Sequence, residues 1–467
     1  MAPKRRRTKI VATWGPALAK DERLRDAIRG GVDVFRLNFS HASHDEVANV
    51  VPRIRRIAEE EQRAIALLQD IQGPRIRTGA LLNGLPIELE TGSLVTISPE
   101  NGAADPRHIH VTYPGFAHDV RVGDRILIAD GTLVLRAERV SENTVDARIE
   151  HGGPLGEHKG VNLPDSQVSV EPLTEKDIVD LRFGAEIDVD YVALSFVRRA
   201  SDVEACKDHL RGMGRDTPVI SKIEHPLAIA NLEAILEASD GVMVARGDLG
   251  VEVSPERVPL LQKRIIRRAN EVGIPVITAT QMLESMVESP TPTRAEASDV
   301  ANAILDGTDA VMLSAETAIG KHAVRAVETM ARIAVQAESA DRPPVRFQRS
   351  GQAYQIARSA VDLSSALDAT ALLVFTRSRH TAETISLNRP DRPAYALTPS
   401  LATARRLALW YAVEPIVGPD MHEIEQMGEY GIAELRRRGA VGEGDTVVLM
   451  GSSPQGPPNL INVRTIE

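Results

Sequence analysis

The chain of 467 residues is long enough for about two to four domains, and its hydrophobic share of 43% and charged share of 26% are typical of globular proteins. The net charge of −10 and the aromatic share of 3% argue against a nucleic-acid-binding protein, which needs a basic surface and stacking rings.

The single cysteine and the hydropathy pattern indicate the compartment. Cys206 has no second cysteine to pair with, so an intrachain disulfide framework is excluded and a reducing cytoplasm is expected. The basic start of the chain leads into no apolar segment, so we predict no secretory signal. No stretch approaches about eighteen consecutive apolar residues, so we predict no membrane span.

Short apolar runs alternate with helical patterns from Thr8 onward. Strands are predicted at residues 9–13, 32–38 and 64–70, with helices at about 20–29 and 43–62 between them. This rhythm then changes. Residues 74 to about 170 consist of short alternating strands separated by turn signals, which predicts an all-β module.

The strand–helix alternation resumes at Thr174, which is predicted to cap a helix together with Asp177. Five further strands are predicted at residues 191–196, 218–224, 241–246, 275–280 and 310–316. Eight strand–helix units in series predict an α/β fold, a (β/α)8 TIM barrel of residues 1–73 and 171–340 with the β domain of residues 74–170 inserted. An open doubly wound sheet is the alternative, but it would not place polar residues at so many strand ends.

A smaller α/β domain is predicted after the barrel. Residues 341–344 (DRPP) are typical of a linker, so this C-terminal domain would comprise residues 341–467. A helix is predicted at residues 354–367, and strands at 371–375, 394–397 and 446–450.

Polar residues lie at the carboxyl ends of the predicted barrel strands, where barrel enzymes carry their active sites. Glu224 and Asp248 are oxygen ligands suited to Mg²⁺ or Mn²⁺. Lys222 and Arg36 are cations of the kind that phosphoryl transfer requires, and backbone N–H groups at Gly247 and Asp248 suit a carboxylate. The remaining polar residues at these ends are Asn38, Ser40, Asp70, Ser195, Thr280, Ser314 and Glu316.

Six motifs closely resemble those of pyruvate kinase. They are RLNFSH at residues 36–41, KGVNLP at 159–164, SKIE at 221–224, VARGDLGVE at 244–252, ATQMLESM at 279–286 and MLSAET at 312–317. The resemblance runs from about Thr8 to the C-terminus. It is most specific in the barrel and loosest in about the last hundred residues.

The resemblance implies a cytoplasmic, homotetrameric glycolytic enzyme that transfers a phosphoryl group from phosphoenolpyruvate to ADP, giving pyruvate and ATP. It implies that Lys222 stabilises the transferring group and that Glu224 and Asp248 bind the divalent metal. Thr280 would lie where the enolate is protonated, with Ser314 and Glu316 in a water relay. Ala245 and Gly247 would join Arg36, Lys222, Asp248 and Thr280 in binding the substrate. The nucleotide would be bound by Arg36, Asn38, His41, Arg77 and Lys159, under an inserted domain that closes as a lid.

Two other classes of protein remain open at this point. A different Mg²⁺-dependent barrel enzyme that makes a pyruvate enolate, such as an aldolase or lyase, would share the metal carboxylates but need neither Arg36, Lys159 nor the lid. A catalytically silent sugar-phosphate or nucleotide sensor would not be expected to keep Lys222 and Thr280 together.

The monovalent-cation site of the family has changed in this sequence. Many pyruvate kinases hold K⁺ at positions matching Asn38, Ser40, Asp70 and the residue after that aspartate, which is usually Thr. Here that residue is Ile71, which has no side-chain oxygen, and Arg75 stands where those enzymes carry a carboxylate. This pattern resembles the family members that work without K⁺, so we predict that K⁺ is not required.

A phosphorylated allosteric effector is predicted to bind the C-terminal domain. The hydroxyls of Thr376, Ser378 and Thr381 follow a strand and open a helix, with two arginines nearby. The family often binds an effector here, usually with a glycine at the position of Arg379. The alternative is that Thr381 only caps the helix.

Overall fold

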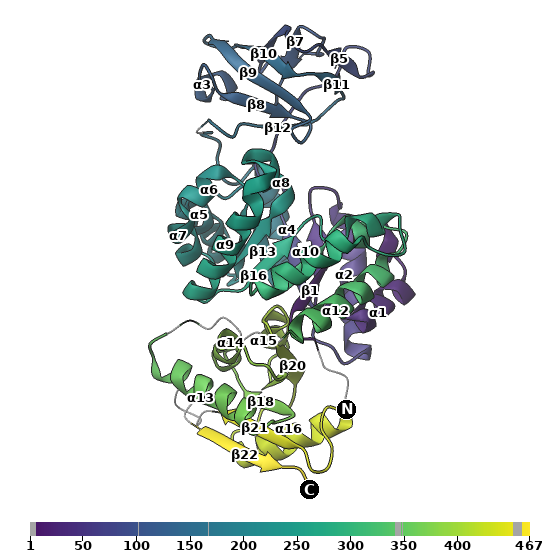
Figure 1. Cartoon of the computed structure of the whole chain (residues 1–467), viewed down its shortest axis with the longest axis vertical. Helices are drawn as coiled ribbons and strands as arrows, with labels where there is room; N and C mark the ends of the chain where they lie inside the picture. The colour runs from purple at the N-terminus through teal and green to yellow at the C-terminus, as the bar shows by residue number, and fades with distance from the viewer. Residues whose placement is uncertain (1–5, 101, 167, 341–346, 348, 452–459) are drawn as a thin grey trace.

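The computed structural model describes residues 6–100, 102–166, 168–340, 347, 349–451 and 460–467. Three units follow one another along the long axis of the molecule (Figure 1). The β-rich inserted unit lies at one end, the barrel in the middle and the C-terminal unit at the other end. The predicted linker at residues 341–344 lies outside the described residues.

The predicted eight-stranded barrel is confirmed, and every pairing in it is parallel. Its strands in chain order are β1 (Lys9–Thr13), β2 (Val34–Asn38), β3 (Ala66–Asp70), β13 (Tyr191–Leu194), β14 (Val219–Ile223), β15 (Gly241–Ala245), β16 (Val276–Ala279) and β17 (Ala310–Leu313). These strands are nearly continuous apolar runs because helices cover the barrel outside and packed side chains fill it inside.

The α-helices of the barrel unit follow its strands, and most of them pack on the outside of the barrel. They are α1 (Asp21–Gly30), α2 (His44–Glu60), α4 (Glu175–Glu186), α5 (Ala200–Gly212), α6 (Pro226–Ala230), α7 (Leu232–Ala238), α8 (Arg246–Glu252), α9 (Val258–Val272), α10 (Arg294–Leu305), α11 (Ala315–Ala318) and α12 (Ala323–Glu338). All five strands predicted after the inserted unit end sooner than expected, at Leu194, Ile223, Ala245, Ala279 and Leu313. In the last three, Arg246 already begins α8, Thr280 turns away with φ of 65° and Ser314 precedes α11.

The inserted unit begins after β3 and ends before α4. It forms a sheet in the order β4-β12-β8-β9-β10-β6-β7, with β11 and β5 paired beside it. The strands are β4 (Ile76–Arg77), β5 (Ile87–Leu89), β6 (Leu94–Ser98), β7 (His108–His110), β8 (Arg125–Ile128), β9 (Leu133–Val140), β10 (Val145–His151), β11 (Gly153–Leu155) and β12 (Gly160–Asn162). One short helix, α3 (Phe116–Asp119), is added to the predicted all-β content.

One buried carboxylate, Asp177, joins the two crossings between the barrel and the inserted unit. The predicted capping box of α4 is present, and Asp177 Oδ2 accepts from Thr174 N at 2.9 Å. Asp177 Oδ1 also accepts from Gly73 N at 3.0 Å. The residues before and after the inserted unit are therefore fixed to the same side chain.

The C-terminal unit is a five-stranded sheet in the order β20-β19-β18-β21-β22. The predicted strands correspond to β18 (Ala371–Phe375), β19 (Ala394–Thr398) and β21 (Thr446–Gly451), and the helices are α13 (Gln352–Ala366), α14 (His380–Leu387), α15 (Leu401–Leu407) and α16 (Ile424–Arg437). The sequence prediction missed β20 (Val413–Val417) and β22 (Leu460–Thr465). Both are edge strands, where an internal proline in β20 and polar residues in β22 are tolerated but weaken the sequence pattern.

Candidate functional site

Several of the polar residues predicted at the strand ends converge at the barrel mouth. The inserted unit lies next to the barrel along the long axis of the molecule (Figure 1). Lys222 Nζ lies 2.8 Å from Ser195 Oγ, 3.4 Å from Asp70 Oδ1 and 3.5 Å from Glu224 Oε2. Arg36 Nε lies 2.6 Å from Asp70 Oδ2. Adjacent parallel strands thus bring two cations and two carboxylates together from distant parts of the sequence.

Neighbouring charges decide the protonation states of Lys222 and Asp70 at the mouth. Burial alone would lower the pKa of Lys222, but the carboxylates of Asp70, Glu224 and Asp248 raise it above its usual value. Burial would likewise raise the pKa of Asp70, yet Lys222 and Arg36 hold it below its usual value. Lys222 is therefore a buried ammonium at neutral pH, directed at the mouth of the barrel.

The Glu224 carboxylate has one oxygen that is ready for a further partner. Its Oε1 accepts from Phe196 N at 2.6 Å, whereas the buried Oε2 has no hydrogen-bond donor. Burial and the nearby charge of Asp248 raise the pKa of Glu224 to about 7 against the influence of Lys222. No group of three or more His, Cys, Asp or Glu side chains suited to a metal occurs in the described part of the chain. Glu224 Oε2, which accepts no hydrogen bond, and the partly exposed carboxylate of Asp248 fit a Mg²⁺ or Mn²⁺ ion that takes its other oxygens from water and substrate.

Thr280 lies beside the first turn of α8. Its Oγ1 accepts from Gly247 N at 2.7 Å and donates to the Ala279 carbonyl at 2.6 Å. A substrate carboxylate that used the Gly247 N–H would therefore compete with the Thr280 hydroxyl. The predicted substrate residue Ala245 is buried and ends β15 immediately before this turn.

Ser314 and Glu316 differ in how completely they are bonded. Both oxygens of the buried Glu316 accept backbone N–H groups, Oε1 from Leu283 at 2.9 Å and Oε2 from Ser314 at 2.7 Å. Burial raises the pKa of Glu316 despite these bonds. Ser314 Oγ is buried and has no hydrogen-bond partner. Glu316 thus holds two loops together, and Ser314 keeps an unused hydroxyl.

A cavity of about 1000 Å³ opens between β1, β2, α2 and α11. The predicted residues Arg36, Asn38, His41 and Ser314 lie in its lining. Sequence reasoning missed its other walls, which include Trp14, Pro16, Asn49, Arg53, Ala318 and Ile319. The Trp-Gly-Pro turn after the first strand could have indicated the wall at residues 14–16, but nothing in the sequence indicated that α2 and α11 face each other across it.

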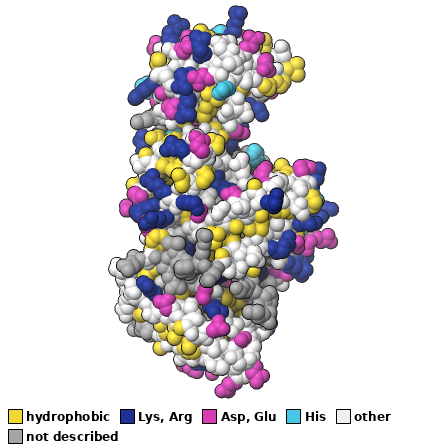
Figure 2. Space-filling model, in the orientation of Figure 1, with side chains coloured by type: hydrophobic (Ala, Val, Ile, Leu, Met, Phe, Trp, Pro, Cys, Tyr) yellow, Lys and Arg dark blue, Asp and Glu magenta, His cyan; other side chains and the backbone are white. Residues whose placement is uncertain are grey.

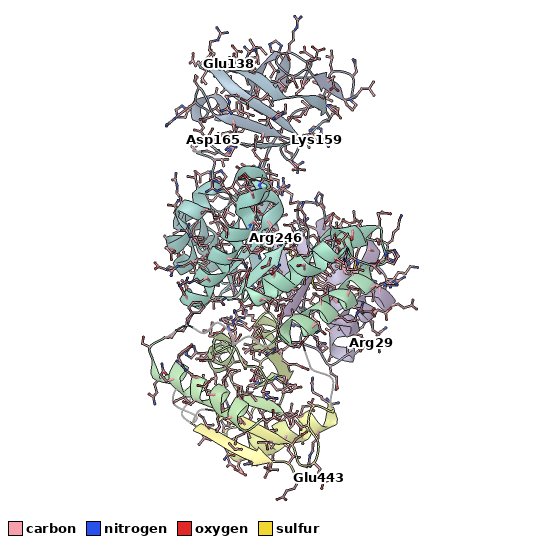
Figure 3. All side chains as sticks on the ribbon, in the orientation of Figure 1. Arg29, Glu138, Lys159, Asp165, Arg246 and Glu443 are labelled. Atoms are coloured by element: carbon pink, nitrogen blue, oxygen red, sulfur yellow. The ribbon has the colours of Figure 1, made fainter. Side chains whose placement is uncertain are left out.

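Two of the basic residues predicted to bind the nucleotide, Arg77 and Lys159, belong to the inserted unit and not to the barrel. Arg77 and Gly160 are paired between β4 and β12, with Lys159 next to them (Figure 3). A recess separates the inserted unit from the barrel on the face shown in Figure 2. Sequence reasoning missed one contact here, in which Asn162 Nδ2 donates to Glu252 Oε1 at 2.6 Å.

Arg75 reaches from the first crossing into the same mouth. Its Nη2 lies 3.8 Å from Asp248 Oδ1, and its guanidinium lies 5.5 Å from the ring centroid of Phe196. Nearby, Asn38 Oδ1 accepts from Ser40 N at 3.2 Å. The side chain of Ile71 is buried and offers no oxygen, and its carbonyl accepts from Ser195 Oγ at 2.7 Å.

The predicted effector residues Thr376 and Ser378 lie between β18 and α14, and Thr381 is the second residue of α14. Thr376 Oγ1 is buried without a hydrogen-bond partner. Thr381 does not cap the helix, because Arg379 precedes the first helical residue and no side chain provides a cap. Arg379 has φ of 73°, in the region that favours glycine, and its guanidinium lies 3.7 Å from Glu383.

Comparisons with known proteins give a consistent result. Residues 5–327 match the family model described as the pyruvate kinase barrel domain, and residues 354–466 match the pyruvate kinase alpha/beta domain. The chain is 44% identical over 474 residues to "Pyruvate kinase 2" of Synechocystis, covering 100% of this chain and 80% of the relative. It is 43% identical over 469 residues to "Pyruvate kinase" of Staphylococcus aureus strain MRSA252, covering 99% of this chain and 80% of the relative. Within the described residues, no helix has the length and apolar character needed to cross a membrane.

Proposed function

This chain belongs to the pyruvate kinase family and is a phosphotransferase, and we propose that it uses one Mg²⁺ or Mn²⁺ held by Glu224 and Asp248 to move the phosphoryl group of phosphoenolpyruvate to ADP. The observation that carries this proposal is the buried Lys222 ammonium, 3.5 Å from the oxygen of Glu224 that accepts no hydrogen bond.

Phosphoryl transfer breaks the bond between phosphorus and the enol oxygen and forms a bond to an oxygen of the β-phosphate of ADP. The electron pair of the broken bond remains on the resulting enolate. Lys222 and Arg36 offset the negative charge on the phosphoryl oxygens, and they do so strongly because their own side chains are largely buried. When bound, the divalent cation supplies further positive charge beside these oxygens.

The enolate then takes a proton at its methylene carbon to give pyruvate. We assign the hydroxyl of Thr280 to the face where this proton arrives, with the Ser314 hydroxyl next in a water relay. Because Glu316 is fully bonded to backbone N–H groups, its part in the relay is to hold the loops of Leu283 and Ser314 in place. Thr280→Val is therefore expected to slow protonation more than phosphoryl transfer.

The cavity beside β1 and α2 is proposed to bind the nucleotide. Asn38 and His41 would contribute from its lining, and Arg77 and Lys159 would contribute from the inserted unit. Burial and the charges of Arg75, Arg36 and Arg77 lower the pKa of His41, so its ring is neutral at pH 7. A neutral ring can stack or share one hydrogen bond, which leaves the phosphate charges to the arginines and Lys159. Closure of the inserted unit, residues 74–170, as a lid over the barrel mouth would exclude water from the transferring group.

Turnover of phosphoenolpyruvate with ADP tests this proposal. Pyruvate formation is coupled to lactate dehydrogenase, with aldolase and lyase substrates as controls. Turnover that requires ADP and Mg²⁺ is expected. Absence of ADP-dependent turnover, or activity only toward an aldolase or lyase substrate, would overturn the proposal.

The remaining parts of the proposal concern regulation and assembly. We propose a cytoplasmic homotetramer that works without K⁺, in which Arg75 supplies the positive charge that a bound monovalent cation supplies elsewhere. A phosphorylated effector would bind at Thr376, Ser378 and Thr381, which the unpartnered hydroxyl of Thr376 supports. The catalytic division would comprise residues 1–73 and 171–340, and the regulatory division residues 341–467.

A further inference from the structure

The residue after β16, Thr280, has an unusual backbone conformation. Thr280 and Gln281 have φ of 65° and 52°, both in the left-handed region. That region disfavours residues with a side chain, and β-branched residues most of all, so two in succession persist only where neighbouring groups hold them. The hydroxyl assigned to proton transfer is therefore carried by a segment that needs external support.

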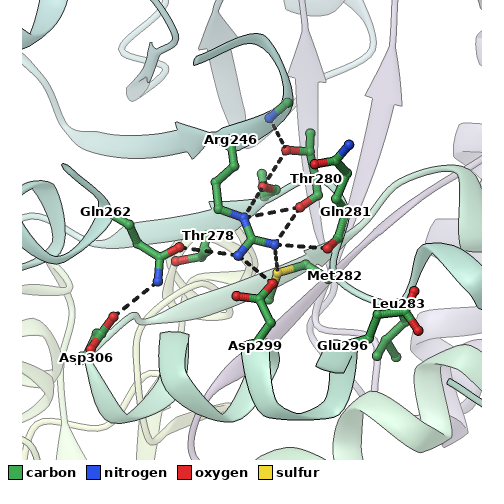
Figure 4. Close-up of polar contacts among 12 residues, drawn as sticks. Arg246, Gln262, Thr278, Thr280, Gln281, Met282, Leu283, Glu296, Asp299 and Asp306 are labelled. Carbon is green, nitrogen blue, oxygen red and sulfur yellow. Dashed lines mark hydrogen bonds and ion pairs between the residues drawn. The ribbon is translucent and has the colours of Figure 1, made fainter. Parts of the chain in front are cut away.

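Arg246, the first residue of α8, gives that support (Figure 4). Its Nη2 donates to the Thr280 carbonyl at 2.7 Å and to the Gln281 carbonyl at 3.2 Å. Its Nε lies 3.2 Å from the Ala279 carbonyl and 3.3 Å from that of Thr280. One guanidinium thus bonds three successive carbonyls, those of the two left-handed residues and of Ala279 before them.

The guanidinium is itself held from two further helices. Its Nη1 lies 2.7 Å from Asp299 Oδ2 on α10 and 3.3 Å from Gln262 Oε1 on α9. Gln262 is in turn bonded to Asp306 at 3.1 Å. The Arg246 side chain is only 8% exposed, so it reaches the barrel mouth only through the segment it binds.

We infer that Arg246 is a positioning residue for the reaction. It fixes the 279–281 segment in the conformation that keeps Thr280 Oγ1 2.7 Å from Gly247 N. Arg246 acts through Thr280 and touches no reacting atom. A lysine in its place has three donors on one nitrogen and cannot span three carbonyls and a carboxylate together. This inference rests on the proposed assignment of Thr280 to enolate protonation.

The test compares two half-reactions in Arg246→Lys and Thr280→Val. Protonation is followed in reverse, as deuterium incorporation into the methyl group of pyruvate in D₂O with ATP and Mg²⁺, by proton NMR. Phosphoryl transfer is followed as ATP formation in single-turnover rapid quench. Arg246→Lys is expected to slow deuterium incorporation at least tenfold more than ATP formation. The double variant is expected to show no larger change in that ratio than Thr280→Val alone.

Arg389 provides a matched control. It is also buried and also bonds a carbonyl, at 2.7 Å from Gly307 O. Arg389 belongs to the C-terminal unit and contacts the barrel just before β17, at the opposite end from the mouth. Arg389→Lys is expected to lower the melting temperature without changing the ratio of the half-reactions. Asp299→Asn, which weakens the support of Arg246 without removing it, is expected to shift the ratio in the same direction by a smaller factor.

The outcomes separate the two ideas. An unchanged ratio in both Arg246→Lys and Asp299→Asn, while Thr280→Val changes it, overturns the positioning inference alone. An unchanged ratio in Thr280→Val overturns the assignment of Thr280 and with it the inference. Equal shifts in Arg246→Lys and Arg389→Lys would show general destabilisation and would also overturn it.

Discussion

The position of Arg75 leads to a quantitative prediction about monovalent cations. Its Nη2 lies 3.8 Å from Asp248 Oδ1, with side chains 33% and 31% exposed. At that distance the attraction between unit charges is about 4 kcal/mol at an effective dielectric constant of 20 and about 1 kcal/mol in bulk water. Because both groups are partly exposed, we take the attraction between Arg75 and Asp248 as about 1–2 kcal/mol, which is equivalent to about 5- to 30-fold in rate.

The assay is turnover in buffers whose only monovalent cation is tetramethylammonium, with and without KCl. Activity near its maximum without KCl is expected, because the Arg75 guanidinium already offsets the negative charge at the mouth. Arg75→Glu should be at least about tenfold slower, and partial rescue by KCl should also require Ile71→Thr. Arg75→Lys keeps the charge and should stay near the parent. Arg139→Glu controls for charge reversal elsewhere on the inserted unit, since its side chain is 77% exposed.

Activation of the unaltered protein by KCl of tenfold or more, about 1.4 kcal/mol of barrier, would refute the reasoning. It would mean that the remaining oxygens of Asn38, Ser40 and Asp70 bind a cation that Arg75 does not replace.

Three further predictions concern catalysis, stability and regulation. Lys222→Met should lower kcat by at least about a hundredfold while the circular dichroism spectrum is retained, because a buried cation at the reacting group is lost, and near-normal turnover would contradict its assignment. Burial lowers the pKa of His225 to about 4, whereas an unfolded histidine titrates near 6.5. Between about pH 6.5 and pH 4 the unfolded state thus binds more protons than the folded state. The free energy of unfolding should therefore fall by up to about 3 kcal/mol as the pH drops through this range. His225→Asn should lose this part of the slope in urea titrations, and equal slopes would count against the argument. A panel of sugar phosphates and nucleoside monophosphates should include one that shifts the phosphoenolpyruvate saturation curve, and Thr376→Val should abolish the shift; a curve that no compound moves would leave the effector site without support.

The architecture of the barrel was predictable from the sequence because each of its strands is a short apolar run buried on both faces. Such runs stand out against the helical patterns between them, and eight in series have few other solutions. The edge strands β20 and β22 were missed for the same physical reason, since an edge strand has less apolar burial to mark it.

The candidate site was predictable as a set of residues but not as a set of contacts. The carboxyl ends of parallel barrel strands meet at one mouth, so Lys222, Glu224 and Asp248 could be placed together before any distance was known. The 3.4 Å approach of Lys222 to Asp70 joins residues 152 positions apart and depends on the packing of several strands. The walls of the cavity beside Trp14 depend likewise on where α2 and α11 lie.

The sequence by itself therefore determined the barrel, its inserted β unit and the chemical character of its mouth, because local periodicity and strand ends are properties of short segments. Only the tertiary structure decided which donor meets which acceptor. It placed the guanidinium of Arg246 on three carbonyls of the segment that carries Thr280, and it brought the carboxylate of Asp177, which the sequence predicted only as a helix cap, onto Gly73 N as well. These bonds join residues that are far apart in the chain or on different elements, and the packing of whole helices against the barrel sets their geometry.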